Sequence, residues 1–262
     1  MKIDGKRIVL TGAASGIGRE LLAQLARYDA EIVAADLNAE KLSESVRAPQ
    51  NIRASLNPFV CDLSTQDGTD ELFAHALATM NGIDIFIANA GFAYYEELKQ
   101  AAWGHIANIY QTNVFSPFYA AIRMQEINQS NPYLAVITAS TMAEWGIPGY
   151  ALYASTKSAV DSFADTYRYE MPDNGRLMTV YPIGTRTNFF EQADAPLVYP
   201  LQTPQVVAAS IVSGIEQGKN RVYPSAAYRL ASFINRFLPI IKPLVQHTYL
   251  RQLRRQSRPT QP

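Results

Sequence analysis

Residues 11–18, Thr11-Gly12-Ala13-Ala14-Ser15-Gly16-Ile17-Gly18, decide the fold of this chain because they join a strand pattern to a helix pattern. The five residues that end at Thr11, RIVLT, form a short, apolar and β-branched run, which is typical of a buried strand. Leucines then recur at helical spacing over residues 17–28. The stretch is therefore predicted to be a tight turn that leads from a strand into a helix.

The glycine spacing of this turn, G-x-x-x-G-x-G, suits a phosphate-binding cradle. Gly12 would allow the tight turn, Gly16 would let the backbone approach a pyrophosphate, and Gly18 would permit close packing of helix on strand. The first N–H groups of the helix would point at the phosphates. A glycine-rich turn can also be an ordinary connection, so the rest of the chain must decide between the two interpretations.

Strand and helix patterns alternate along most of the chain. The expected strands are 7–11, 31–36, 57–62, 84–89, 133–139 and 176–181. The expected helices are 17–28, 38–46, 67–81, 101–129 and 151–171. Apolar strands separated by helices indicate an α/β fold with a doubly wound, mostly parallel sheet of the Rossmann type. We expect residues 1–223 to form one dinucleotide-binding catalytic domain and residues 224–262 a basic, amphipathic helical extension.

Length and composition exclude several classes of protein. The 262 residues suffice for one large α/β domain, and a hydrophobic share of 48% excludes a disordered chain. Cys61 is the single cysteine, so no internal disulfide is possible, and the three histidines lie too far apart in the sequence to suggest a metal site. The start of the chain lacks a signal-peptide pattern, and no apolar run approaches the ~18 residues of a membrane span. We expect a cytoplasmic protein.

The net charge of zero hides a sharp asymmetry. All 23 acidic residues lie at or before Glu216, together with 14 basic residues, so this part carries a charge of −9. The nine basic residues after Glu216 give the remaining segment a charge of +9. Such a split predicts an interaction with a negatively charged partner or surface.

Two acidic residues at predicted strand ends suit the adenosine part of a dinucleotide. Asp36 closes the second strand, where its carboxylate can accept hydrogen bonds from both ribose hydroxyls. It would repel a 2′-phosphate, and neither Ser15 nor Leu37 offers that phosphate a basic side chain, so NAD is favoured over NADP. Asp62, at the end of the third strand, either hydrogen-bonds the adenine amino group or caps the following helix.

Tyr153 and Lys157 are four residues apart and therefore lie on one face of a helix. A phenol with a pKa near 10 is a poor base at neutral pH, but a nearby cation, together with the nicotinamide charge, favours the phenolate. Ser140 ends the fifth strand, thirteen residues earlier, where its hydroxyl can hold a substrate oxygen. Each feature taken alone is common, because it also describes an exposed helical pair or a turn residue at a strand end.

In combination these residues resemble the short-chain dehydrogenase/reductase family, in its compact, single-domain branch. The resemblance covers residues 5 to about 223. It depends on the order and spacing of Thr11–Gly18, Asp62, Asn89-Ala90-Gly91, Asn113, Ser140, Tyr153 and Lys157.

The resemblance implies a role for each residue of a catalytic set, Asn113, Ser140, Tyr153 and Lys157. Tyr153 would be the general acid/base, Ser140 would orient the carbonyl or alcohol, and Lys157 would bind the nicotinamide ribose and lower the Tyr153 pKa. Asn113 would bend its helix and hold a water that relays protons from Lys157. Asn89 would lie beside the cofactor ribose, in a turn that steadies the sheet. The expected dinucleotide-binding residues are Gly12, Ser15, Gly16, Ile17, Gly18, Asp36, Leu37, Asp62, Leu63, Asn89, Ala90, Gly91, Tyr153, Lys157, Pro182, Ile183, Thr185 and Thr187.

One position departs from the family pattern. Ile183 stands after Pro182 where the family usually has glycine, and Thr187 keeps the place of the threonine that contacts the nicotinamide carboxamide. A β-branched residue disfavours positive φ, so Ile183 must face the nicotinamide pocket or push the loop aside. Backbone contacts of Ile183 with the cofactor thereby become plausible.

Aromatic and apolar residues cluster where the family places its substrate loops. The expected pocket residues are Tyr94, Met142, Trp145, Tyr150, Phe189 and Phe190, with Tyr95 and Tyr199 nearby; about half of such residues are expected to be core or lid packing. This nearly uncharged set suits a hydrophobic alcohol or ketone.

The segment after Tyr223 combines apolar residues at helical spacing with basic ones. Leu230, Phe233 or Ile234, Phe237 and Ile241 form the stripe; Pro239 and Pro243 are expected to break the helix, which resumes at Tyr249. Two interpretations are open: a lid or dimer arm packed on the substrate loops, and a peripheral contact with an anionic membrane that brings the pocket to a lipid substrate. Nucleic-acid binding is disfavoured because the final arginines are few and no nucleic-acid-binding motif accompanies them.

The expected function is NAD-dependent interconversion of a secondary alcohol and a ketone on a hydrophobic, lipid- or steroid-like substrate. One alternative is an NADPH-linked reductase of a β-oxo lipid or quinone-like ring, against which Asp36 argues. Another is a dinucleotide-binding sensor or membrane-attached interaction protein without turnover. The family resemblance also implies a homodimer or homotetramer formed through the helices near 101–129 and 151–171.

Overall fold

The computed structural model describes residues 1–256 except 101, 188, 190–194 and 196–199, with side chains as far as Arg254. Its strands are β1 (Lys6–Thr11), β2 (Ala30–Asp36), β3 (Ser55–Val60), β4 (Ile85–Ala88), β5 (Tyr133–Thr138), β6 (Gly175–Val180) and β7 (Arg221–Val222). Its helices are α1 (Gly16–Leu25), α2 (Ala39–Arg47), α3 (Gln66–Met80), α4 (Trp103–Tyr110), α5 (Ser116–Ile127), α6 (Ala151–Glu170), α8 (Pro204–Glu216), α9 (Ala226–Phe237) and α10 (Ile241–Gln256).

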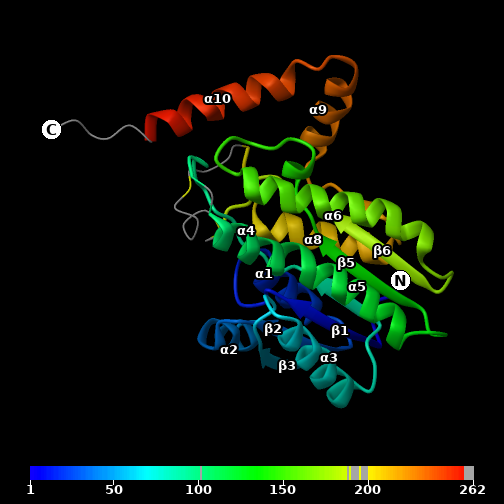
Figure 1. The fold of residues 1–262 in the computed structure, drawn as a ribbon. Coiled ribbons are helices and arrows are strands. Elements are labelled where there is room, and N and C mark those ends of the chain that lie inside the picture. Colours follow the sequence, from blue (N-terminus) through cyan, green and yellow to red (C-terminus); the bar gives the residue numbers. More distant parts are fainter. Residues whose placement is uncertain (101, 188, 190–194, 196–199, 257–262) are drawn as a thin grey trace.

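The seven strands form one parallel sheet in the order β3-β2-β1-β4-β5-β6-β7 (Figure 1). Helices cover both faces, which confirms the predicted doubly wound α/β fold. Alternate residues of β1 point to opposite faces: Ile8 and Leu10 pack with α1, α2 and α8, whereas Val9 packs with α3, α5 and α6. The strand order reverses between β1 and β4, and this switch point is where doubly wound sheets bind ligands.

Four local features differ from the sequence-based expectations. The strand β7 and the helix α8 were not expected, because β7 has two residues and no strong pattern marks 204–216. The long helix expected over 101–129 consists of α4, a π-helical turn at Gln111–Phe115, and α5. The strand expected at 57–62 lies at 55–60, and its Pro58 is tolerated because β3 is an edge strand.

The extension folds into the two helices α9 and α10. The expectation that Pro243 breaks the helix is wrong: α10 begins at Ile241, so Pro243 falls in its first turn, where the missing N–H needs no partner. The helix is interrupted instead around Pro239, between α9 and α10. Figure 1 shows α9 and α10 as a separate layer beyond α4 and α6. None of the helices within the described residues has the length and apolar character required to cross a membrane.

Candidate active site

The glycine turn after β1 is packed too tightly for side chains at two positions. Gly12 has φ +67°, and a Cβ there would come within 2.9 Å of the Ala90 Cα. A Cβ on Gly18 would collide with the carbonyl oxygen of Gly12. The turn therefore brings the start of α1 directly against the end of β4, as the packing argument from the glycines requires.

The beginning of α1 fits the pyrophosphate of a dinucleotide. Ser15 is the residue before the helix, and its side chain does not cap it; the first turn carries no acidic residue. Gly12, Ser15, Gly16 and Ile17 all line a cavity. Free N–H groups at the positive end of the helix dipole thus face this cavity, which is the chemistry that an anion needs.

Asp36 lies at the edge of the same cavity, at the end of β2. Its Oδ2 accepts the N–H of Ala14 at 3.0 Å, and its Oδ1 accepts the N–H of Asn38 at 3.0 Å. These bonds tie the carboxylate to the glycine turn and to the start of α2. Leu37, which also lines the cavity, is 67% exposed and leaves the space beside Asp36 open.

Asp62 does not cap the following helix. The α3 cap is Thr65, whose hydroxyl accepts the N–H of Gly68 at 3.0 Å, and the Asp62 Oδ1 instead accepts the N–H of Ser64 at 2.9 Å. This geometry overturns the capping alternative. Asp62 and Leu63 line the cavity, so contact of Asp62 with an adenine stays a prediction.

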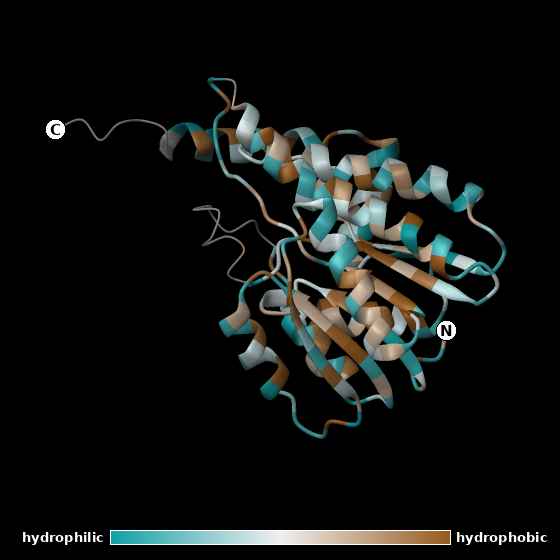
Figure 2. Ribbon diagram, turned by 60° about the horizontal axis from the view of Figure 1, so that its bottom comes forward, coloured by the Kyte–Doolittle hydropathy of each residue, from teal (hydrophilic) through white to brown (hydrophobic). Residues whose placement is uncertain are grey.

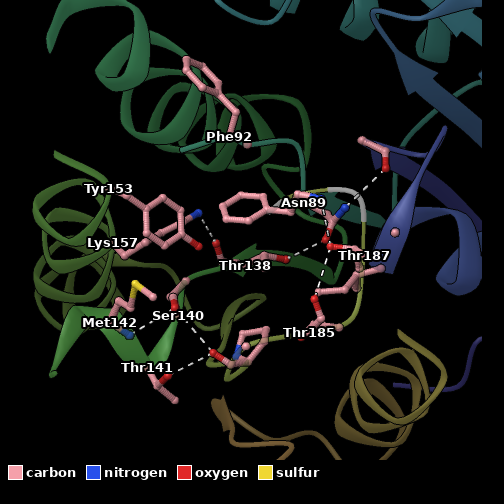
Figure 3. Close-up of a pocket in the computed structure, with 18 of the residues that line it drawn as sticks. Asn89, Phe92, Thr138, Ser140, Thr141, Met142, Tyr153, Lys157, Thr185 and Thr187 are labelled. Atoms are coloured by element: carbon pink, nitrogen blue, oxygen red, sulfur yellow. Dashed lines mark hydrogen bonds between the residues drawn. The ribbon is translucent and has the colours of Figure 1, made fainter. Parts of the chain in front are cut away.

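The turn after β4 is cross-linked to its neighbouring strands. The Thr11 hydroxyl accepts the N–H groups of Asn89 and Ala90 at 3.0 and 3.1 Å. The Asn89 side chain donates to the Thr11 carbonyl at 3.3 Å. It accepts from the Thr138 hydroxyl at 3.3 Å (Figure 3). Asn89 therefore steadies β1, β4 and β5 at their carboxyl ends. Thr11 and Thr138 were not singled out from the sequence, although both end buried strands.

Ser140, Tyr153 and Lys157 gather on one side of the cavity, across from Asn89 and Thr187 (Figure 3). The Ser140 hydroxyl accepts the N–H of Met142 at 3.1 Å, which fixes its direction. The Lys157 Nζ donates to the Thr138 carbonyl at 2.8 Å and lies 5.5 Å from the centre of the Tyr153 ring. The phenol, the hydroxyl and the ammonium thus converge, as their spacing in the sequence predicts.

Burial shifts the proton affinity of both titratable groups. It raises the pKa of Tyr153 to about 12, partly offset by a hydrogen bond with Ser140, and it lowers the pKa of Lys157 to about 8. In the protein alone, burial therefore outweighs the lowering of the Tyr153 pKa that we expected from Lys157. Tyr153 is a protonated phenol at neutral pH and is prepared to donate its proton.

Asn113 lies within the π-helical turn between α4 and α5 and is 1% exposed. Its Oδ1 accepts the N–H of Phe92 at 3.1 Å, while its Nδ2 donates to the Phe92 carbonyl at 2.9 Å and to the Thr156 hydroxyl at 3.2 Å. The side chain thus joins the loop after Gly91 to α6, which carries Tyr153 and Lys157. A relay of protons through Asn113 stays a prediction.

The loop after β6 forms another wall of the cavity and reaches the glycine turn. Thr187 lies against Gly16: a Cβ on Gly16 would come 3.0 Å from the Thr187 Cγ2. The Thr185 hydroxyl donates to the Ile183 carbonyl at 2.9 Å. Ile183 has an ordinary negative φ and lines the cavity together with Pro182, so the replacement of glycine causes no backbone strain.

The cavity has a volume of about 910 Å³ and continues past Tyr153 into an apolar end. Of the expected substrate residues, Tyr94, Met142, Trp145 and Phe189 line it. Contrary to expectation, Tyr150 does not: it is fully buried behind the cavity wall, 5.0 Å from Tyr95 and 6.3 Å from Tyr153 between ring centres. Phe190 and Tyr199 lie outside the described residues.

The extension supplies the far wall of this apolar end. Ile241, a member of the predicted stripe, lines this wall, and the wall residues that the sequence did not predict are Ala227, Tyr228, Ala231, Val245 and Tyr249. Their spacing of three to four residues is compatible with one face of a helix and could have predicted this wall. The more apolar stripe of Leu230, Phe233 and Phe237, however, lies on the opposite face of α9. The inner faces of α9 and α10 thus pack over the chamber, and we call these two helices the lid.

Glu144 holds this lid in place. Its carboxylate accepts hydrogen bonds from the hydroxyls of Tyr223, Tyr228 and Ser232 at 2.8, 3.0 and 2.8 Å. The Lys242 Nζ donates to the Glu144 carbonyl at 2.8 Å. Glu144 follows Ser140 by four residues, so the loop that positions Ser140 also anchors both lid helices.

Comparison with known proteins agrees with this geometry. The family model for short chain dehydrogenases matches residues 6–197. The chain is similar to a 3-oxoacyl-(acyl-carrier-protein) reductase of Thermotoga maritima, with 27% identity over 70% of this chain and 75% of the relative. It is also similar to the 3-ketodihydrosphingosine reductase of Dictyostelium discoideum, with 28% identity over 89% of this chain and 79% of the relative.

Two solved structures share the fold. A short chain dehydrogenase/reductase of Burkholderia phymatum, in complex with NAD, has a TM-score of 0.80 and 20% identity, with coverage of 100% of this chain and 99% of that one. A short-chain dehydrogenase of Sphingobium yanoikuyae, in complex with NADPH, has a TM-score of 0.78 and 19% identity, with coverage of 89% and 94%. From the family match and the convergence of Ser140, Tyr153 and Lys157, the chain belongs to the short-chain dehydrogenases, a family of NAD(P)-dependent oxidoreductases.

Proposed function

We propose that this protein uses NAD to interconvert a secondary alcohol and a ketone on a hydrophobic, lipid- or steroid-like substrate. The observation that carries the proposal is the position of the Tyr153 phenol within one continuous cavity. This cavity has the anion-binding glycine turn at one end and an apolar chamber at the other. A proton donor placed between a dinucleotide cradle and an apolar chamber suits redox chemistry at a carbon that carries an oxygen.

The residues of the site divide the work of this reaction. A bound nicotinamide would donate or accept the hydride. For reduction of a ketone, Tyr153 donates its phenolic proton to the substrate oxygen; for oxidation of an alcohol, the phenolate removes that proton. Ser140 holds the oxygen by a hydrogen bond whose direction Met142 has already fixed, which stabilises the charge that develops there. Lys157, held by Thr138, favours the phenolate through its charge.

The chamber favours an apolar substrate. Its wall consists of aromatic and aliphatic side chains from three parts of the chain: Tyr94, Met142, Trp145, Ile147, Phe189, Ala227, Tyr228, Ala231, Ile241, Val245 and Tyr249. No ionised side chain belongs to this set, so a carboxylate or phosphate group in the chamber would lose its hydration without a partner. The names of two relatives, a 3-oxoacyl-(acyl-carrier-protein) reductase and a 3-ketodihydrosphingosine reductase, also indicate ketones on acyl chains.

Asp36 supports NAD as the cofactor because its negative carboxylate would repel the negative 2′-phosphate of NADP. The test compares kcat/KM with the two dinucleotides in the wild type and in Asp36→Asn. We expect the wild type to prefer NAD, and Asp36→Asn to reduce that preference about tenfold, an effect of roughly 1.4 kcal/mol. A clear preference of the wild type for NADPH would contradict the assignment.

A second candidate is an NADPH-linked reductase of a β-oxo lipid. The raised pKa of Tyr153 favours only its reductive direction, because it keeps the phenol protonated for donation to a ketone. Initial rates in both directions at neutral pH, on secondary alcohols and ketones of increasing chain length, separate the two. The first proposal expects oxidation with NAD and a kcat/KM that rises with chain length.

We also propose a homo-oligomer built on α4, α5 and α6. Trp103 on α4 is 83% exposed, Phe115 at the end of the π-helical turn 60%, and Ile122 on α5 42%; Tyr169 on α6 is 93% exposed. Exposed large apolar side chains on neighbouring helices suit an interface between subunits. Analytical ultracentrifugation of the wild type and of a variant with Phe115→Glu and Ile122→Glu tests this: we expect a dimer or tetramer that the variant dissociates.

A further inference from the structure

The outer side of the lid carries a row of exposed apolar side chains, which we call the outer face. It consists of Leu230, Phe233, Ile234, Phe237, Leu238, Ile240 and Leu244. Phe237 is 71% exposed, and Phe233 and Leu244 are each 63% exposed. Figure 2 shows hydrophobic and hydrophilic residues alternating along this part of the ribbon. A row this long within fifteen residues exceeds the scattered single exposures that are normal on a protein surface.

The outer face is separate from the surfaces that α9 and α10 use within the chain. On α9, Ala227, Tyr228 and Ala231 line the cavity, and Ser232 binds Glu144. Leu230, Phe233 and Phe237 project from the other side of the same helix, as their three- to four-residue spacing requires. The lid is therefore two-sided: one side closes the substrate chamber and the other presents apolar side chains outward.

Positive charge borders the outer face. Arg229 and Arg236 are exposed on α9, and Arg251 and Arg254 are exposed on α10. No described carboxylate forms an ion pair with any of these four arginines, and no acidic residue follows Glu216 in the chain. An apolar stripe bordered by arginines is the composition of a helix that lies in the interface of an anionic bilayer.

We propose that α9 and α10 dock on the surface of an anionic lipid bilayer, with the outer face inserted at the boundary of headgroups and acyl chains. Charge argues against a second copy of this chain as the occupant. Two extensions placed face to face would bring together two segments of charge +7, whereas anionic lipid neutralises them. The apolar side chains of the outer face distinguish the bilayer from a free polyanion, which would offer them no apolar surface.

Docking in this orientation would place the substrate chamber next to the membrane. Ile241, Val245 and Tyr249 of α10 line the chamber, while Leu244 of the same helix belongs to the outer face. An apolar substrate could then pass from the bilayer to Tyr153 between the two lid helices. This part of the inference rests on the proposed function, whereas docking itself does not.

Co-sedimentation with vesicles tests the docking. We expect the wild-type protein to sediment with vesicles that contain about one-third phosphatidylserine and to remain in solution with pure phosphatidylcholine. A variant with Phe233→Glu and Phe237→Glu should lose at least tenfold in vesicle affinity. A second variant, Arg229→Gln with Arg236→Gln, should lose severalfold, and about 1 M salt should weaken the wild type in the same way.

Two matched control variants exclude effects that any change of surface charge would have. Ile52→Glu replaces an apolar side chain that is 46% exposed at the far end of the sheet, and Arg47→Gln removes an exposed charge from α2. Both should sediment like the wild type, and thermal unfolding should show that all variants fold. Sedimentation of the Phe233→Glu and Phe237→Glu variant at the wild-type level would overturn the proposal. So would a wild type that binds no vesicle and forms a dimer which this variant dissociates.

A turnover assay separates docking from catalysis. With a long-chain ketone embedded in anionic vesicles, the Phe233→Glu and Phe237→Glu variant should lose about tenfold in kcat/KM, while turnover of a short, water-soluble ketone stays unchanged. Vesicle binding without turnover of any alcohol or ketone would contradict the proposed function and leave the docking intact. Equal loss of both activities would overturn delivery of the substrate through the lid.

Discussion

The dinucleotide end of the cavity is built on the sheet, whereas the substrate end is closed by two helices that follow it in the chain. At the first end, Thr11, Asn89 and Thr138 connect the carboxyl ends of three adjacent strands through backbone and side-chain hydrogen bonds. At the second end, the lid depends on the side chains that meet at Glu144 and on apolar contacts around the chamber. The core of the fold thus holds the cofactor residues, while a local contact holds the lid.

This difference predicts which properties a substitution at each end of the cavity should change. Changes at the sheet end should affect chemistry, dinucleotide binding and global stability together, because the same strands form the core. Changes at the lid should affect the binding of an apolar substrate and leave the rest of the molecule nearly untouched. Substitutions at the two ends of the cavity test whether the sheet end and the lid differ in this way.

The largest effect is expected at the junction of the two ends. Tyr153→Phe removes the phenolic proton and should lower kcat by about 10²–10⁴-fold, while the Kd for NAD changes less than twofold. Steady-state rates and a fluorescence titration with NADH measure the two quantities. Tyr150→Phe is a matched control, because Tyr150 is a buried tyrosine of the same helix region that lies outside the cavity and should keep wild-type turnover. Near-normal turnover in Tyr153→Phe would remove Tyr153 from the chemistry.

The second prediction concerns the buried charge at the sheet end. The pKa of Lys157 is lowered from 10.5 to about 8, so between these two values the unfolded chain binds a proton that the folded protein does not. Stability should therefore rise with pH in this window, by on the order of 3 kcal/mol in the limit. Buried tyrosines with raised pKa values, such as Tyr153, lower the stability of both proteins near pH 10, so the effect of Lys157 is a difference between them. From pH 8 to pH 10 the free energy of urea unfolding of the wild type should increase relative to that of Lys157→Met. Lys219→Met, at an exposed lysine, should retain it; the same pH dependence in Lys157→Met would show that another group causes it.

The third prediction tests the cross-link between the strands. Thr11→Val keeps the shape of the side chain but deprives the N–H groups of Asn89 and Ala90 of their acceptor. The free energy of unfolding should fall by about 1–3 kcal/mol, and NAD should bind more weakly because the turn after β4 moves. Chemical denaturation followed by circular dichroism measures the first effect. An unchanged unfolding curve would mean that these hydrogen bonds do not stabilise the sheet end.

The smallest effect is expected at the lid. Glu144→Ala leaves Tyr223, Tyr228 and Ser232 without their common acceptor, so the lid should open more readily. KM for a long-chain ketone should rise about tenfold, with the Kd for NAD and the free energy of unfolding close to the wild-type values. Glu126→Ala, at an exposed glutamate of α5, is the control. A large loss of stability in Glu144→Ala would contradict the contrast between the two ends.

The sequence predicted the sheet end far better than the lid. The glycine turn, Asp36 and the Tyr153–Lys157 pair follow from strand ends and from helical spacing, which are local patterns, and Asn89 follows from the family resemblance. The hydrogen-bonding roles of Thr11 and Thr138 were not predicted, because a threonine that ends a strand has the same pattern as any β-branched residue. Their role depends on the neighbour across the sheet, which local spacing does not reveal.

The lid was harder to predict because its two sides both carry apolar residues. Leu230, Phe233 and Phe237 gave the stronger stripe and suggested the packed side, yet they face outward, while the smaller Ala227 and Ala231 line the chamber. Tyr150 was assigned to the pocket because it lies where the family places a substrate loop, whereas burial places it in the core. Glu144 gave no sequence signal at all, since its partners lie about 80–90 residues further along the chain.

Transfer of a labelled hydride tests the central claim most directly. The protein is mixed, for a single turnover, with NADH that carries deuterium at both C4 positions and with a long-chain ketone, and the product alcohol is examined by mass spectrometry. We predict deuterium at the carbinol carbon in the wild type, and a rate lower by about 10²–10⁴-fold in Tyr153→Phe at saturating NADH. A product without deuterium, or equal rates in the two proteins, would contradict the account.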